Sequence, residues 1–139
     1  MKLILTSLIS LTIGFNCLAQ SYNTKSTHAL KNETATTIQS GYDAYKKIAL
    51  NIWDYAELGY KEKKSSALLQ QTLKDNGFTV EAGVAGMPTA FVATYGSGSP
   101  VIGILAEYDA LPGLSQDNSS TKTTMANKPN GHGCGHHLF

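Results

Sequence analysis

The sequence VIGILAEYD, residues 101–109, decides the fold that we predict for this chain. An unbroken run of apolar residues and glycine ends in two carboxylates, Glu107 and Asp109. Apolar runs that do not alternate with polar residues are typical of strands buried on both faces, as in sheets covered by helices. We therefore expect a strand at residues 101–109 and an α/β fold in which helices cover the sheet.

The residues before this strand predict two helices and two further strands. Apolar side chains recur at spacings of three and four from about residue 34 to residue 56, which predicts a helix that Gly59 ends. A second helix is expected from about residue 62 to residue 76. FTVEA (78–82) and TAFVATY (89–95) are expected strands, since they are rich in β-branched and aromatic residues.

The N-terminal residues have the layout of a secretory signal peptide. An apolar core from Leu3 to Phe15 follows a basic residue, and the small residue Ala19 offers a cleavage site. We therefore expect residues 1–19 to be a signal peptide and the protein to be exported, either periplasmic or secreted. An uncleaved membrane anchor and a lipid anchor on Cys17 are the alternatives. Residues 20–33 are polar and lack periodicity, and we expect them to form a flexible lead-in.

Length and charge limit the size of the fold and the class of partner. A chain of 139 residues with a hydrophobic fraction of 42% has room for one globular domain at most. Its net charge of +1, without a basic stripe, argues against nucleic acid as a partner. Once the signal peptide is removed, we expect no association with a membrane.

The last nine residues, GHGCGHHLF (131–139), hold the best candidates for a metal site. Cys134 and His136 are two apart, so a locally extended backbone puts both on one side, and thiolate and imidazole are the usual ligands of zinc. Asp109 is the most plausible carboxylate partner for this pair. It would serve either as a third metal ligand or as a hydrogen-bond acceptor for the His136 imidazole. A polar loop at residues 113–131 is expected to border the site.

Two other interpretations of these residues stay open at this point. Cys134 could be a nucleophile activated by a nearby histidine, or a buried and inert structural cysteine. Glu107 and Asp109 point to the same face of a strand, yet on spacing alone they could be solvated turn residues.

The combination of AEYDALPGLS and GHGCGHHLF resembles metal-dependent amidohydrolases of the aminoacylase and carboxypeptidase family, nearest the aminobenzoyl-glutamate and hippurate hydrolase branch. The resemblance covers about residues 35–139. It implies a catalytic α/β domain with a mixed, helix-covered sheet, a pair of divalent ions (zinc, manganese, cobalt or nickel), and an inserted lid and dimerisation domain. It also implies a homodimer at full length. The implied reaction is hydrolysis of an amide bond in N-acyl amino acids, aminobenzoyl-glutamate-like conjugates or short peptides.

The resemblance also implies roles for single residues. Cys134 and His136 match metal ligands, and Asp109 matches an acid that orients a metal-binding imidazole. The family's glutamate base and its other ligands lie downstream of this motif. We therefore expect residues 34–139 to be the N-terminal portion of a truncated catalytic domain, with half of the metal site and no activity alone. The alternative is a non-catalytic metal-binding or interaction fragment. No role is assigned to Glu107, His132 or His137.

Overall fold

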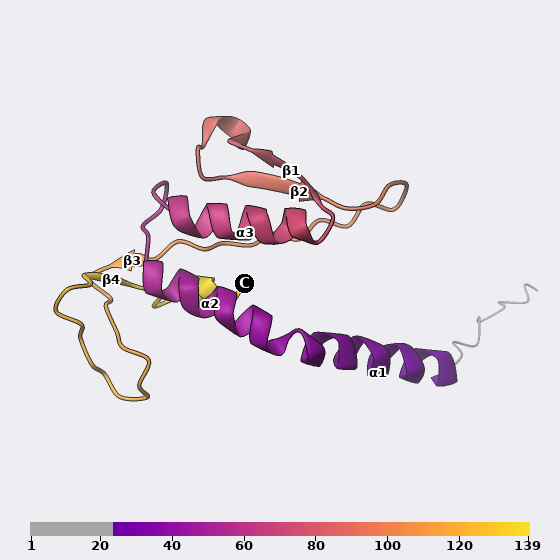
Figure 1. The fold of residues 1–139 in the computed structure, drawn as a ribbon, viewed down its shortest axis with the longest axis horizontal. Coiled ribbons are helices and arrows are strands. Elements are labelled where there is room, and N and C mark those ends of the chain that lie inside the picture. Colours follow the sequence, from indigo (N-terminus) through magenta and orange to yellow (C-terminus); the bar gives the residue numbers. More distant parts are fainter. Residues whose placement is uncertain (1–23) are drawn as a thin grey trace, which may run out of the picture. The chain divides into compact units, whose positions relative to one another are not determined.

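The computed structural model describes residues 24–139, and within them the fold is mixed α and β (Figure 1). The expected signal peptide, residues 1–19, lies outside the described residues. None of the described helices is both long enough and apolar enough to cross a membrane. The elements are α1 (Thr24–Ser40), α2 (Tyr42–Tyr55), α3 (Lys63–Asp75), β1 (Thr79–Ala82), β2 (Phe91–Thr94), β3 (Leu111–Pro112), β4 (Asn130–Gly131), and the 3-10 turns η1 (Val84–Gly86) and η2 (His136–Leu138).

The chain divides into two compact units, and the candidate site lies in the second, Ile38–Phe139. The first unit ends at Thr37 and contains most of α1. We expected residues 20–33 to form a flexible lead-in, and those of them that the structure describes, residues 24–33, are helical. These residues carry no periodic apolar stripe, so the sequence contained no sign of this helix.

The helix predicted from about residue 34 to residue 56 is interrupted at Gly41, where α1 gives way to α2. A Cβ atom at Gly41 would lie 2.5 Å from the Tyr45 ring, so the bare backbone lets that ring pack closely. Helix α2 ends at Tyr55, and Ala56 then turns left-handed with its N–H bonded to the carbonyl of Ile52. The stop therefore comes three residues before Gly59.

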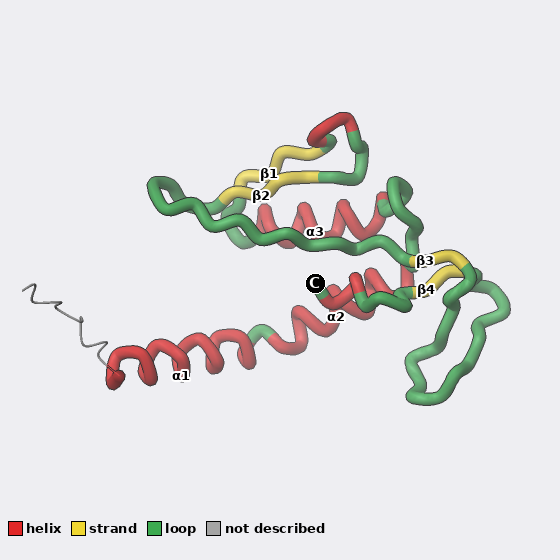
Figure 2. The backbone as a smooth tube through the Cα atoms, turned by 180° about the vertical axis from the view of Figure 1, so that it is seen from behind, coloured by secondary structure: helices red, strands yellow, loops and turns green. Residues whose placement is uncertain are grey.

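The second predicted helix and both early strands are confirmed by α3, β1 and β2. Strands β1 and β2 form an antiparallel hairpin in which Thr79 pairs with Thr94 and Ala82 pairs with Phe91. Helix α3 packs against both strands on one side and against α2 on the other, so it is the middle layer of this unit (Figure 2).

The expected strand at residues 101–109 is not formed. These residues are irregular, and neither of the two antiparallel sheets among the described residues includes them (Figure 2). The side chains of Val101, Ile102, Ile104 and Leu105 are between 83% and 92% exposed. A strand needs neighbours for its backbone hydrogen bonds and cover for its apolar faces, and the described residues supply neither here.

The polar loop predicted at residues 113–131 is present, and a short antiparallel pair closes its base. Leu111 pairs with Gly131 in β3 and β4, and the N–H of Gly113 bonds to the carbonyl of Pro129. This closure brings residues just after Asp109 next to residues just before Cys134. The loop therefore sets the distance between the two segments that carry the candidate site residues.

Candidate metal centre

Asp109 is positioned by its neighbour Ala110, which is buried against the turn that follows α2. The Ala110 N–H bonds to the carbonyl of Glu57 at 2.7 Å, and Ala110 forms a parallel bridge with Leu58. A Cβ atom at Gly59 would lie 4.0 Å from the Asp109 carboxylate, so this turn runs directly beside the site. The end of the 101–109 segment is thus anchored, although the part before it is not.

The same turn is fixed by the Glu57 carboxylate, which caps α3. It accepts hydrogen bonds from the N–H groups of Lys64 and Ser65 and from the Ser65 hydroxyl, at 2.9 to 3.0 Å. Those N–H groups belong to the first turn of α3 and have no partner within the helix. A negative charge there also complements the helix dipole. Glu57 therefore ties α3 to the turn that holds Asp109.

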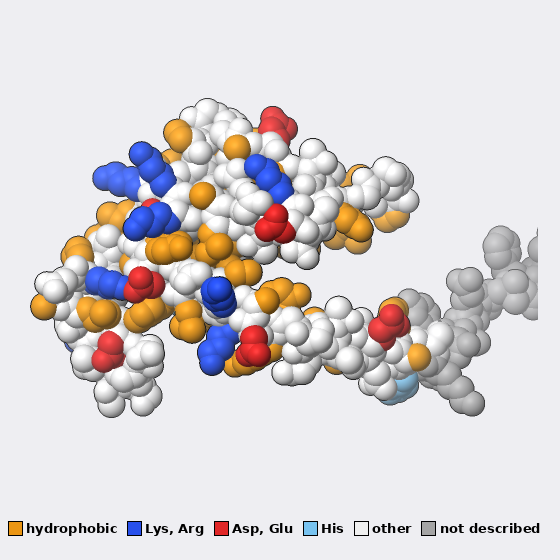
Figure 3. Space-filling model, viewed as in Figure 1, with side chains coloured by type: hydrophobic (Ala, Val, Ile, Leu, Met, Phe, Trp, Pro, Cys, Tyr) orange, Lys and Arg blue, Asp and Glu red, His pale blue; other side chains and the backbone are white. Residues whose placement is uncertain are grey.

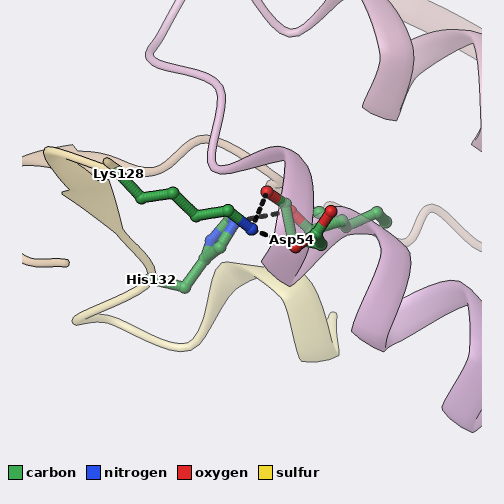
Figure 4. A network of polar contacts seen from close by, with 4 residues as sticks. Asp54, Lys128 and His132 are labelled. Carbon is green, nitrogen blue, oxygen red and sulfur yellow. Dashed lines mark hydrogen bonds and ion pairs between the residues drawn. The ribbon is translucent and has the colours of Figure 1, made fainter. Parts of the chain in front are cut away.

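A second anchor joins the chain before Cys134 to the last turn of α2 (Figure 4). We call it the α2 clamp, and its members are the three alternate residues Lys128, Asn130 and His132. Lys128 pairs with Asp54, the Asn130 amide donates to the carbonyl of Ala56 at 3.2 Å, and the His132 Nε2 lies 3.0 Å from the carbonyl of Ile52. Donors at a helix C-terminus satisfy carbonyls that have no partner within the helix, as at Ala56, whereas the Ile52 carbonyl also accepts from the Ala56 N–H.

His136, on the turn after the clamp, lies between two carboxylates. Its Nδ1 is 2.6 Å from the Asp109 Oδ1, and its Nε2 is 3.0 Å from the Glu107 Oε2. One ligand atom from each of the three residues lies within 4.8 Å of the others. The His136 side chain is 17% exposed, that of Asp109 is 33% exposed and that of Glu107 is 56% exposed, so the cluster is more open on the Glu107 side.

The donor set of this cluster fits a divalent metal ion. An Nδ1–H donated to Asp109 fixes the imidazole tautomer and leaves the Nε2 lone pair for a metal, which is the usual arrangement around ligand histidines. Two ligand atoms that share a zinc ion lie about 3.3 Å apart, close to the distance between His136 Nε2 and Glu107 Oε2. Imidazole and carboxylate also suit manganese, cobalt and nickel.

Of the predicted site residues, the structure brings Asp109 and His136 together but leaves Cys134 apart. Cys134 lies on an exposed turn and is not a member of the three-residue cluster. Its exposure contradicts the alternative of a buried, inert cysteine. Glu107, to which the sequence assigned no role, joins the cluster. The sequence feature that indicated this is the spacing of two residues between Glu107 and Asp109, which puts both carboxylates on one face of an extended chain.

His132 and His137 lie behind the cluster with their rings 5.0 Å apart. The Nδ1 atoms of both are buried and have no hydrogen-bond partner. Burial lowers the pKa of both imidazoles, so both favour the neutral form. A carbonyl can only accept, so the His132 Nε2 carries the proton that it shares with Ile52. His132 is thus a structural donor in this arrangement.

A buried carboxylate that the sequence did not single out, Glu62, also lies beside Gly59, where a Cβ atom would be 3.9 Å from its Oε1. It is 7% exposed and accepts a hydrogen bond from the Thr89 hydroxyl at 2.7 Å. The carbonyl of Thr89 in turn accepts from the hydroxyls of Ser66 and Tyr108. Burial raises the pKa of Tyr108, and the charge of Glu62 adds to this effect. Tyr108, which stands between Glu107 and Asp109 in the sequence, is therefore held beside α3.

Comparison with known proteins relates this sequence to a family of hydrolases. No family model matches the chain. The chain is 44% identical over 103 residues to one of the subunits of p-aminobenzoyl-glutamate hydrolase from Escherichia coli, a match that covers 73% of this chain and 21% of that protein. It is 37% identical over 92 residues to thermostable carboxypeptidase 1 of Saccharolobus solfataricus, covering 65% of this chain and 23% of that protein.

Thermostable carboxypeptidase 2 of the same organism is 36% identical over 92 residues, again covering 65% of this chain and 23% of that protein. The chain thus spans about a fifth of the length of the curated relatives that it matches. All three relatives are named for hydrolysis. This chain therefore belongs to an amidohydrolase and peptidase family.

Proposed function

We propose that this chain carries the first half of the metal site of an enzyme that hydrolyses an amide or peptide bond. The observation that supports this most is the placement of the His136 imidazole between the carboxylates of Asp109 and Glu107. In this proposal residues 34–139 are the N-terminal portion of a helix-covered, mixed-sheet catalytic domain, and the remaining ligands and the general base lie on other residues of the complete enzyme.

His136 and Cys134 would hold the metal, with Glu107 as a further ligand. The complete site would take two divalent ions, for which zinc, manganese, cobalt and nickel are all suitable. When bound, such ions lower the pKa of a water molecule and polarise the carbonyl of the scissile amide.

The protein's own contribution is to hold the imidazole in one orientation and one tautomer. Asp109 accepts the Nδ1 proton of His136, so Nε2 is directed toward Glu107, and a metal ion that entered between them would take the Nε2 lone pair. Asp109 itself is held through Ala110 and the Glu57 turn, and the chain before Cys134 is held by the α2 clamp. The two halves of the cluster are therefore fixed from two separate parts of the fold, and this prepositions His136.

The names of the relatives support a substrate class. One is named for p-aminobenzoyl-glutamate and two are named as carboxypeptidases. We propose that the complete enzyme acts on N-acyl amino acids, aminobenzoyl-glutamate-like conjugates or short peptides, that it forms a homodimer, and that residues 1–19 direct its export to the periplasm or beyond the cell.

A chimera tests the function directly. Residues 34–139 would replace the matching segment of the E. coli hydrolase subunit, and hydrolysis of p-aminobenzoyl-glutamate would be measured with added metal. We expect hydrolysis, a loss of at least ~100-fold in His136→Ala and Cys134→Ala, and full activity in the exposed control Lys61→Ala. A folded chimera that binds metal without hydrolysis would favour the non-catalytic alternative.

A further inference from the structure

Tyr108 contacts a different part of the fold from the metal cluster, although both of its neighbours in the sequence belong to the cluster. Glu107 and Asp109 each contact the His136 imidazole. The Tyr108 hydroxyl instead donates a hydrogen bond to the carbonyl of Thr89. Successive side chains leave an extended segment on opposite sides. The contact that Tyr108 makes on one side therefore affects how the two carboxylates are presented on the other.

Both the ring and the hydroxyl of Tyr108 are held. The ring stacks on that of Phe91 in β2, with the centroids 6.1 Å apart and the planes inclined by 23°. Burial raises the pKa of Tyr108, so the hydroxyl keeps its proton and remains a donor at neutral pH. The side chain is therefore attached at two points to the start of β2.

The carbonyl that accepts from Tyr108 belongs to a buried polar network beside α3. This carbonyl, on Thr89, also accepts from the Ser66 hydroxyl at 2.7 Å, and the Thr89 hydroxyl donates to the Glu62 carboxylate at 2.7 Å. All three of these residues are buried. Buried polar groups that are fully bonded to one another form rigid networks. Tyr108 is thus attached to one of the most firmly held parts of the second unit.

Hydrogen bonds can fix an orientation that apolar contacts cannot. Hydrophobic side chains gather over α2 and α3 on the surface of the second unit (Figure 3). Apolar contacts have no preferred direction, whereas hydrogen bonds weaken steeply when they are bent. The hydroxyl of Tyr108, more than the apolar contacts around it, can therefore determine how residues 107–109 are oriented.

Glu107 needs such an anchor, because the backbone around it is not held. No hydrogen bond between backbone groups of the described residues involves residues 101–109, and Ala110 is the first residue after them that makes one. The carboxylates of Glu107 and Asp109 also repel each other when they approach one imidazole. Side-chain contacts close to Glu107 are therefore required to arrange the cluster before a metal binds.

We infer that Tyr108 is a positioning residue of the metal cluster, and that its hydrogen bond to the Thr89 carbonyl sets the orientation of Glu107 and Asp109 toward His136. This inference rests on the proposed function, because it takes the cluster to be a metal site. It goes beyond that function by assigning a role to a residue that is not itself a metal ligand. Tyr108 touches neither metal nor substrate in this proposal. It reduces the ordering that is required when a metal binds.

Tyr108→Phe tests the inference, because it removes the hydroxyl and keeps the ring that stacks on Phe91. We expect the zinc affinity of the purified full chain to fall by about 10-fold, as is typical when a partner of a metal ligand is lost. In nitrogen-15 NMR, the His136 Nδ1 should move toward the position of a ring without a hydrogen bond. The matched control is Tyr95→Phe, since Tyr95 also packs on a phenylalanine, Phe78, but is 70% exposed. It should leave both measurements unchanged.

A tyrosine with a purely structural role would give a different result. Loss of its hydrogen bond would lower the stability to urea, while the zinc affinity and the His136 signal of the folded chain would stay as in the unmodified chain. That result would overturn the inference. A Tyr108→Phe chain that does not fold would also count against it, because the hydroxyl would then support the fold as a whole.

Hydrolysis by the chimera separates this inference from the proposed function. In the chimera, Tyr108→Phe should lose activity at limiting zinc and regain most of it at saturating zinc. Weaker zinc binding in Tyr108→Phe, together with a chimera that does not hydrolyse p-aminobenzoyl-glutamate, would keep the positioning residue and reject the proposed function. Hydrolysis by the chimera, with equal zinc affinity in Tyr108→Phe and the unmodified protein, would reject the positioning residue and keep the function.

Discussion

At the scale of single residues, the molecule holds one imidazole between two acids. Residue types and spacing in the sequence were enough to select Asp109 and His136, because few side chains other than histidine, cysteine and carboxylates bind transition metals. The sequence could not show that Glu107 contacts the same imidazole, since that contact depends on how residues 101–109 meet the tail. The spacing of Cys134 and His136 also could not predict that Cys134 is exposed and lies outside the cluster.

Replacing Asp109 by Asn should weaken zinc binding by about 10- to 100-fold, since an amide in place of the carboxylate is a poorer acceptor for the His136 Nδ1–H. Competition with a chromogenic chelator would measure the affinity of the purified chain. Asp43→Asn is the matched control, because Asp43 is an exposed acid in the first turn of α2 and belongs to neither anchor. Equal zinc affinity in Asp109→Asn and the unmodified chain would show that Asp109 does not orient the imidazole.

At the scale of elements, the predictions that succeeded are those with local signals. Helix α3 has an amphipathic pattern, and β1 and β2 are short, β-branched runs separated by turn residues, so each could be read from its own window. The prediction of a strand at residues 101–109 was wrong because a strand needs neighbouring strands, which no local sequence pattern reveals. The start of α1 was missed because a polar helix has no periodic stripe.

The cap of α3 is such an element-scale feature, and Glu57→Ala tests it. Loss of the carboxylate leaves the N–H groups of Lys64 and Ser65 without their partner and should lower the free energy of unfolding by about 1–2 kcal/mol. Urea denaturation followed by circular dichroism would measure this. Glu81→Ala, at an exposed residue of β1, should change stability much less. A similar loss in both variants would mean that Glu57 acts only through its general charge.

The closure of the polar loop makes a second prediction at this scale. A Cβ atom at Gly131 would lie 1.9 Å from the carbonyl oxygen of Leu114, so Gly131→Ala forces a backbone shift. At Gly133 the contact is 2.5 Å to the flexible end of the Leu114 side chain, which can move aside. We expect Gly131→Ala to cost about 1–3 kcal/mol of stability and Gly133→Ala clearly less. Equal thermal unfolding of the two variants would contradict this description of the loop base.

At the scale of the whole molecule, the described fold has a small core and a large apolar surface. The buried hydrophobic side chains among the described residues are Ile52, Ala56 and Ala110, all of them close to the turn that holds Asp109. The structure therefore gives most order to the elements around the candidate metal centre, and least cover to residues 101–106.

The central claim is that the Nε2 of His136 binds a divalent metal while Nδ1 stays protonated against Asp109. Nitrogen-15 NMR of the histidine rings during a zinc titration of the purified chain tests this most directly. We expect the Nε2 resonance of His136 to move to a metal-bound position and its Nδ1 to keep the shift of a protonated, hydrogen-bonded nitrogen. An unchanged His136 ring at saturating zinc, whether or not zinc binds elsewhere, would contradict the account.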